Sequence, residues 1–101
     1  MRINKRIRVE YETLLKQVGE EKFCSHIVDS GLIAKKEYEN PEIIMLDQSE
    51  AFFALFRTTG NDIYFTIAKL LRKAAHKLYR ILRKKDKNHP KNKRFIQIVK
   101  I

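Results

Sequence analysis

The chain has 101 residues, a formal net charge of +10 at pH 7 and an apolar fraction of 44%. This length suits one domain, residues 1–101, and the apolar fraction excludes the disordered class, in which too little apolar surface is buried to offset chain entropy. Cys24 is the only cysteine and the longest apolar run has six residues, so we expect a cytoplasmic protein with no disulfide and no membrane insertion.

The first thirty residues predict two helices. Residues 4–18 carry apolar side chains at spacings of three and four, which lines one face of a helix, with Asn4 as the N-cap and Gly19 as the stop. A strand remains an alternative for the first few residues. A second, short helix is expected over residues 20–30, with Gly31 as its C-cap.

The middle of the chain predicts one further helix. Asn40-Pro41 marks a boundary, because a residue that precedes proline disfavours the helical conformation. Residues 42–46 fit either a short buried strand or the lead into the next helix, which periodicity does not separate. A helix is then expected over residues 48–58. Its segment from Ala51 to Phe56 is apolar on every side, which predicts burial either in the core or in a homodimer interface.

The strongest periodic element predicts a long helix over about residues 62–85, after a turn and cap at residues 58–62. At the helical rise this element is about 35 Å long, close to the diameter of the domain. Its apolar side chains fall within about 120° of arc, the width of a core-facing stripe. The members of this stripe are Ile63, Ile67, Leu70, Leu71, Ala74, Leu78, Ile81 and Leu82.

The end of the chain predicts a loop and a strand. Residues 87–93 are polar and interrupted by proline, which is typical of a loop. Residues 94–101 are rich in β-branched side chains and indicate a short strand, which would pair with residues 42–46 if those also form one. The predicted fold class is therefore mainly α, with a long basic amphipathic C-terminal helix at its centre.

Charge is distributed very unevenly along the chain. Residues 66–101 have a net charge of +12, with Asp86 as their single acid, whereas the first 65 residues have a net charge of −2. A charge this concentrated produces a field that attracts polyanions.

The basic side chains of the long helix lie opposite its apolar stripe, at spacings that align them along the helix axis. A solvated face that only maintains solubility is the alternative, but such a face normally mixes signs, and no acid occurs between Asp62 and Asp86. We therefore predict phosphate contacts from this face and from the start of the loop. The predicted contact residues are Lys69, Arg72, Lys73, His76, Lys77, Arg80, Arg83, Lys84 and Lys87.

Aromatic side chains near the basic face suggest base stacking, as in proteins that bind single strands. Phe65 points the same way as the basic face, and Tyr79 lies at its margin. Aromatics at a helix end or margin more often pack against a neighbouring element, so we favour packing for both.

Metal binding and catalysis have little support in the sequence. Cys24 and His26 point to different sides of a helix and have no second ligand pair nearby, which argues against a metal site. His76 lies among cations that should lower its pKa, and no acidic orienting partner is visible near it in sequence. We therefore expect a protein that is not an enzyme and has no cofactor.

The sequence favours a small nucleic-acid-binding protein that contacts backbone phosphates through its long basic helix. DNA and RNA, single or double stranded, remain equal alternatives. The second hypothesis is a non-enzymatic protein-interaction or inhibitor module whose basic face docks on an acidic protein surface.

Overall fold

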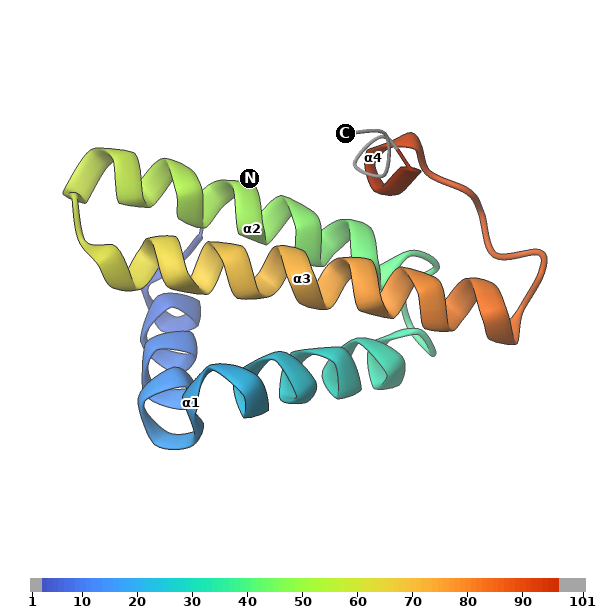
Figure 1. Ribbon diagram of the computed structural model, residues 1–101, viewed down its shortest axis with the longest axis horizontal. Coiled ribbons are helices and arrows are strands. Elements are labelled where there is room, and N and C mark those ends of the chain that lie inside the picture. The colour runs from blue at the N-terminus through green and yellow to red at the C-terminus, as the bar shows by residue number, and fades with distance from the viewer. Residues whose placement is uncertain (1–2, 97–101) are drawn as a thin grey trace.

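The computed structural model describes residues 3–96, which form four helices in the order α1 (Lys5–Ala34), α2 (Pro41–Thr59), α3 (Asp62–Lys85) and α4 (Lys93–Ile96) (Figure 1). The fold is mainly helical, as expected, and residues 3–96 contain no strand. No helix in this described range is long and apolar enough to cross a membrane.

Helix α3 is the element around which the others are arranged. It packs against both α2 and α1, whereas α1 and α2 contact each other much less. In Figure 1 α3 runs between α2 and the second half of α1, while the first half of α1 runs in a different direction. One face of α3 is therefore left free of the two long helices.

Helix α1 combines the two helices expected over residues 4–18 and 20–30. Asn4 is the N-cap, since its side-chain oxygen accepts a hydrogen bond of 2.9 Å from the backbone N–H of Ile7. Gly19 marks a sharp kink, with φ 82° and ψ 173°, and the helix continues beyond it to Ala34. This backbone conformation is open essentially to glycine alone.

Gly31 is not the C-cap that the sequence predicts, because it lies inside α1 and is buried. A Cβ atom at this position would lie 2.3 Å from Leu78 Cδ2 and 2.8 Å from Met45 Cε. The glycine therefore allows α1 to approach α3 closely, and its role is one of packing.

Of the two alternatives for residues 42–46, the strand is wrong and the lead into the next helix is confirmed, because these residues form the first turns of α2. Pro41 occupies the start of the helix, where its missing N–H would have no intrahelical partner and its fixed φ suits the helix. Met45, Leu46 and Phe52 are buried at helical spacing. Tertiary packing thus extends the helix back from the expected start at residue 48.

The segment from Ala51 to Phe56 is buried less uniformly than expected. Phe52 is fully buried and Ala54 is exposed, while the other four side chains are half-buried. Whether this segment also forms a homodimer interface stays a prediction.

Helix α3 occupies the residues expected for the long basic helix, Asp62–Lys85, although α4 follows it in the chain. Its N-cap is Asn61, whose side-chain oxygen accepts a hydrogen bond of 3.2 Å from the N–H of Ile63. All eight members of the predicted apolar stripe are buried or half-buried. Ala68, Ala75 and Tyr79 are buried as well; Tyr79 is covered by Phe95 of the chain that follows α3.

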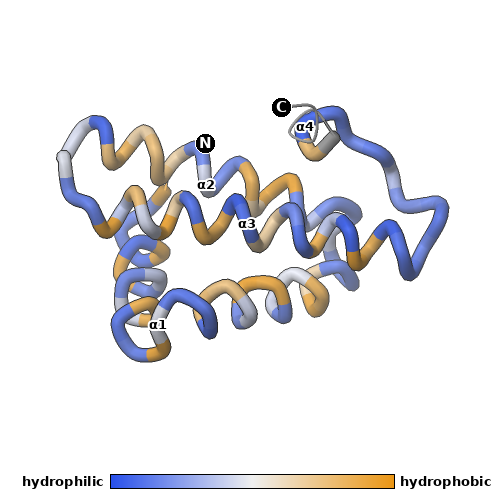
Figure 2. Tube along the Cα trace, viewed as in Figure 1, coloured by the Kyte–Doolittle hydropathy of each residue, from blue (hydrophilic) through white to orange (hydrophobic). Residues whose placement is uncertain are grey.

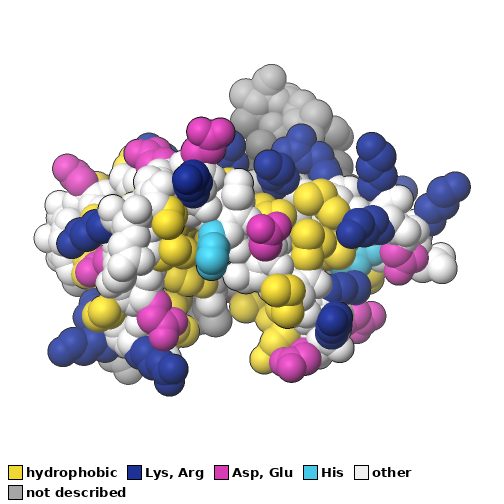
Figure 3. Space-filling model, turned by 90° about the horizontal axis from the view of Figure 1, so that it is seen from below, with side chains coloured by type: hydrophobic (Ala, Val, Ile, Leu, Met, Phe, Trp, Pro, Cys, Tyr) yellow, Lys and Arg dark blue, Asp and Glu magenta, His cyan; other side chains and the backbone are white. Residues whose placement is uncertain are grey.

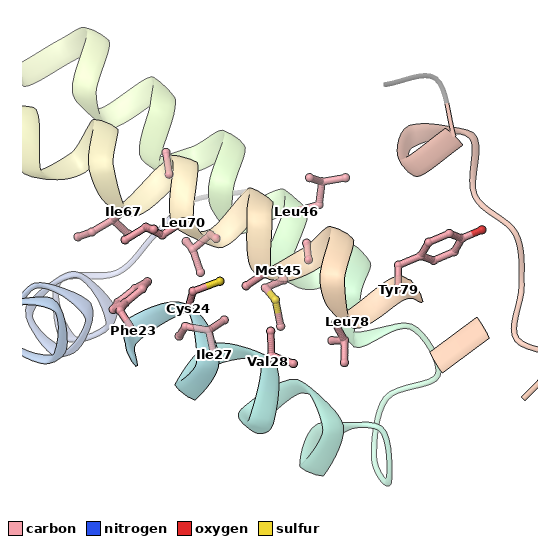
Figure 4. Close-up of a cluster of buried hydrophobic side chains, with 14 of the residues drawn as sticks. Phe23, Cys24, Ile27, Val28, Met45, Leu46, Ile67, Leu70, Leu78 and Tyr79 are labelled. Atoms are coloured by element: carbon pink, nitrogen blue, oxygen red, sulfur yellow. The ribbon is translucent and has the colours of Figure 1, made fainter. Parts of the chain in front are cut away.

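The core lies where α1, α2 and α3 meet. Phe23 and Ile27 of α1 point toward the α3 side chains in Figure 4, and Met45 of α2 completes the cluster. At the α2–α3 contact the buried hydroxyl of Ser49 donates a hydrogen bond of 2.7 Å to the backbone carbonyl of Ala68. In Figure 2 apolar and polar positions recur along α3 at helical spacing. The apolar positions face the core, and the polar positions lie on the free face.

The prediction of a strand over residues 94–101 is wrong for its first part, because Lys93–Ile96 form α4; residues 97–101 lie outside the described range. Arg94 donates to the carboxylates of Asp47 at 2.9 Å and Glu50 at 2.8 Å, both in α2. Phe95 is buried and stacks on Tyr79, with ring centroids 4.5 Å apart. The chain after α3 therefore folds back onto the helices (Figure 1).

Candidate nucleic-acid interface

Seven basic side chains of the predicted contact set are exposed on the free side of α3 and just beyond its end. Positions 69 and 84 are fifteen helical steps apart, or about 22 Å at the helical rise. We call these seven residues the basic surface: Lys69, Arg72, Lys73, Lys77, Arg80, Lys84 and Lys87. In Figure 3 Lys and Arg side chains gather at the upper right, toward the end of the molecule where α3 finishes.

The basic surface carries charge that the described residues leave largely uncompensated. Among residues 3–96, the ion pairs within 4.0 Å are those of Arg6, His89 and Arg94, none of which belongs to this surface. Glu20 and Glu21 of α1 approach it, since they line a surface pocket of about 430 Å³ together with Lys73 and Lys77, and the exposed Asp86 directly precedes Lys87. Glu20 and Glu21 form one border of the basic surface, and α4 lies near its opposite side.

Two of the nine predicted contact residues have other surroundings. His76 is half-buried, and its ring meets the ring of Phe95 edge-on at 5.0 Å. Burial lowers the pKa of His76, and the cations Arg72 and Arg80 lower it further. Arg83 is also half-buried and donates to the backbone carbonyls of Lys87, at 3.0 Å, and His89.

A buried polar cluster holds the loop after α3 in place. The sequence predicts the loop but not this cluster. The imidazole Nε2 of His89 bonds to a carboxylate oxygen of Glu42, and both side chains are almost completely buried. Lys35, just past α1, places its Nζ 3.2 Å from the other imidazole nitrogen. His89 lies in a polar loop, and Glu42 lies in a segment whose sequence fits either a strand or a helix. Neither segment has a periodic pattern that predicts a contact between the two residues.

An aromatic cluster lies at the other end of the basic surface, where α2 ends and α3 begins. The exposed ring of Phe65 contacts Phe53 at 5.7 Å and Phe56 at 5.1 Å between ring centroids. Lys69 Nζ lies 4.8 Å from the centre of the same ring. Tyr79, by contrast, packs against Phe95, which confirms the packing interpretation for that residue.

A separate apolar pocket of about 520 Å³ lies between α1 and α2. Tyr11, Ile27, Ile44 and Gln48 are among its lining residues, and α3 contributes none. The hydroxyl of Tyr11 donates to the side-chain oxygen of Gln48 at 2.8 Å. This pocket is not part of the basic surface.

Residues 3–96 contain no group of three or more His, Cys, Asp or Glu side chains arranged to hold a metal ion. No protein-family model matches the chain, and neither a curated protein nor a solved structure matches it. Any functional assignment must therefore come from the geometry and charge described above.

Proposed function

We propose that this protein binds nucleic acid through the basic surface of α3, with phosphate contacts supplying most of the affinity. The observation that carries the proposal is a set of seven exposed cations, six on one side of α3 and Lys87 just beyond its end, none of which has an acid within ion-pair distance in the described range. Neutralising phosphates with such side chains releases counterions, which drives binding at moderate salt.

The arrangement also costs the free protein stability. Like charges three or four residues apart on a helix repel each other by about 0.2–0.5 kcal/mol per pair. Lys69 and Lys73 are one such pair, and Lys73 and Lys77 are another. A polyanion that binds along α3 removes this repulsion, so folding and binding support each other.

The rigid support of α3 favours the same function. Its opposite face is buried against α1 and α2, so the cations project from a helix that does not have to form on binding. Preorganised cations lose less conformational freedom than cations on a disordered tail. Such contacts fix position along the backbone and carry no sequence information by themselves.

The experiment compares two triple variants of equal charge. Lys73→Glu/Arg80→Glu/Lys84→Glu reverses the basic surface, whereas Lys16→Glu/Lys22→Glu/Lys36→Glu changes exposed lysines elsewhere. Each set of three reversals lowers the net charge by six, from +10 to +4. Anisotropy of labelled duplex DNA, single-stranded DNA and RNA then measures affinity at one salt concentration.

The first variant should lose at least about a hundredfold in affinity, since three phosphate contacts become repulsive, and the second should lose much less. Equal losses would mean that net charge, and not this surface, governs binding. If the wild type binds no nucleic acid near physiological salt, the proposal fails and acidic protein surfaces become the partners to test.

A further inference from the structure

We propose that the exposed ring of Phe65 is a base-stacking platform at one end of the basic surface, so that the preferred ligand is a nucleic acid with unpaired bases. This inference rests on the proposed function, because it names the class of ligand for the same surface. It is carried by the exposure and support of Phe65 and by its contact with Lys69.

Phe65 is the most exposed of the six phenylalanines, all of which lie among the described residues, and 38% of its surface is accessible. One part of the ring packs against Phe53 and Phe56 of α2, and the rest remains accessible to solvent. These contacts fix the orientation of the ring. A ring held in place in this way binds a base at a lower entropic cost than a mobile one.

Lys69 joins the ring to the basic surface. Its ammonium lies 4.8 Å from the ring centre and one helical turn from Phe65, a cation–π geometry. The flexible lysine stem lets this ammonium move aside to a phosphate while the base takes its place over the ring. A nucleotide at this position would therefore stack its base on Phe65 and place its phosphate near Lys69.

Unpaired bases are required because a base inside a duplex already stacks on its neighbours and does not offer its face to a protein ring. Stacking on an aromatic side chain tolerates any base, since every base has a π face. The remaining cations, from Arg72 to Lys84, then follow the backbone along α3. The structure thus points to single-strand binding with little sequence preference.

The test measures affinities of Phe65→Leu, Phe65→Trp and Tyr38→Leu for single-stranded DNA, single-stranded RNA and duplex DNA. Leucine keeps an apolar side chain against Phe53 and Phe56 but removes the π face, whereas tryptophan enlarges that face. Tyr38→Leu removes another exposed aromatic, which lies by the apolar pocket of α1 and α2. Thermal unfolding of each variant establishes that the fold is kept.

We expect the wild type to prefer a single strand. Phe65→Leu should weaken single-strand binding about fivefold or more, with duplex affinity unchanged within about twofold. Phe65→Trp and Tyr38→Leu should retain wild-type single-strand affinity. In addition, fluorescence of a 2-aminopurine base in the strand should be quenched on binding to the wild type and much less on binding to Phe65→Leu.

Three results would overturn the inference and leave the proposed function standing: preference for duplex, equal losses for both ligands in Phe65→Leu, or no loss in that variant. Absence of binding to any nucleic acid would overturn both. If charge reversal of the basic surface abolishes binding but Phe65→Leu does not weaken it, the phosphate contacts are supported and base stacking is not. The two proposals therefore fail by different measurements.

Discussion

The side chains of His89 and Glu42 bond to each other inside the protein although they lie 47 positions apart in the chain. Their side-chain exposures are 0% and 1%. Glu42 belongs to the first turn of α2, and His89 to the loop after α3. This pair, with Lys35 and Arg83 around it, joins three separate segments at the end of the molecule where α3 finishes.

Replacing His89 with alanine should destabilise the protein by about 3–5 kcal/mol, because it leaves the buried carboxylate of Glu42 without its partner. Urea denaturation measures this change. The double variant Glu42→Leu/His89→Leu should recover much of the loss, since it replaces the buried polar pair with apolar side chains and leaves no buried polar group without its partner. A single His89→Ala variant as stable as the wild type would contradict this role for the pair.

Gly19→Ala should lower the free energy of unfolding by about 1–3 kcal/mol. The cause is backbone strain alone, because a Cβ at Gly19 meets no atom within 4 Å while φ is +82°. Gly60 provides the control: it has φ +71° in the left-handed region, which asparagine tolerates, so Gly60→Asn should cost less. Thermal and urea unfolding of both variants compare the two glycines, and a Gly19→Ala variant that loses no more stability than Gly60→Asn would contradict backbone strain at Gly19.

His76 should make stability depend on pH. Burial and the nearby Arg72 and Arg80 lower its pKa below the ordinary value of 6.5, so the unfolded chain binds a proton at a higher pH than the folded protein does. The stability from neutral His76 is therefore present above about pH 6.5 and is lost as the pH falls below it.

The free energy of unfolding, followed from pH 7.5 to pH 5, should thus decrease less in His76→Gln than in the wild type. The wild type and His76→Gln differ only at this position, so the difference between the two curves isolates His76. Identical slopes in the two proteins would show that the pKa of His76 does not change on folding.

The sequence was sufficient to predict the helical class and the position of α3, because the apolar stripe from Ile63 to Leu82 follows the helical period closely. It was also sufficient to predict which side of α3 carries the exposed cations. Both features depend on local spacing, which a sequence shows directly.

The features that sequence reasoning missed depend on contacts between distant segments. For residues 42–46 the sequence left strand and helix open, and they are helical because Met45 and Leu46 are buried there, which a short apolar run cannot reveal. Gly31 is a packing position because Leu78 and Met45 approach it. The aromatic cluster likewise needs Phe53 and Phe65 to meet across the α2–α3 turn.

The salt dependence of nucleic-acid binding tests the central claim most directly. For wild-type protein we expect the logarithm of the association constant to fall with the logarithm of salt concentration with a slope of about −4 or steeper. Lys73→Ala/Arg80→Ala/Lys84→Ala should make the slope shallower by about 2–3, close to one for each cation removed. A wild-type slope near zero, or an unchanged slope in the triple variant, would contradict phosphate binding by α3.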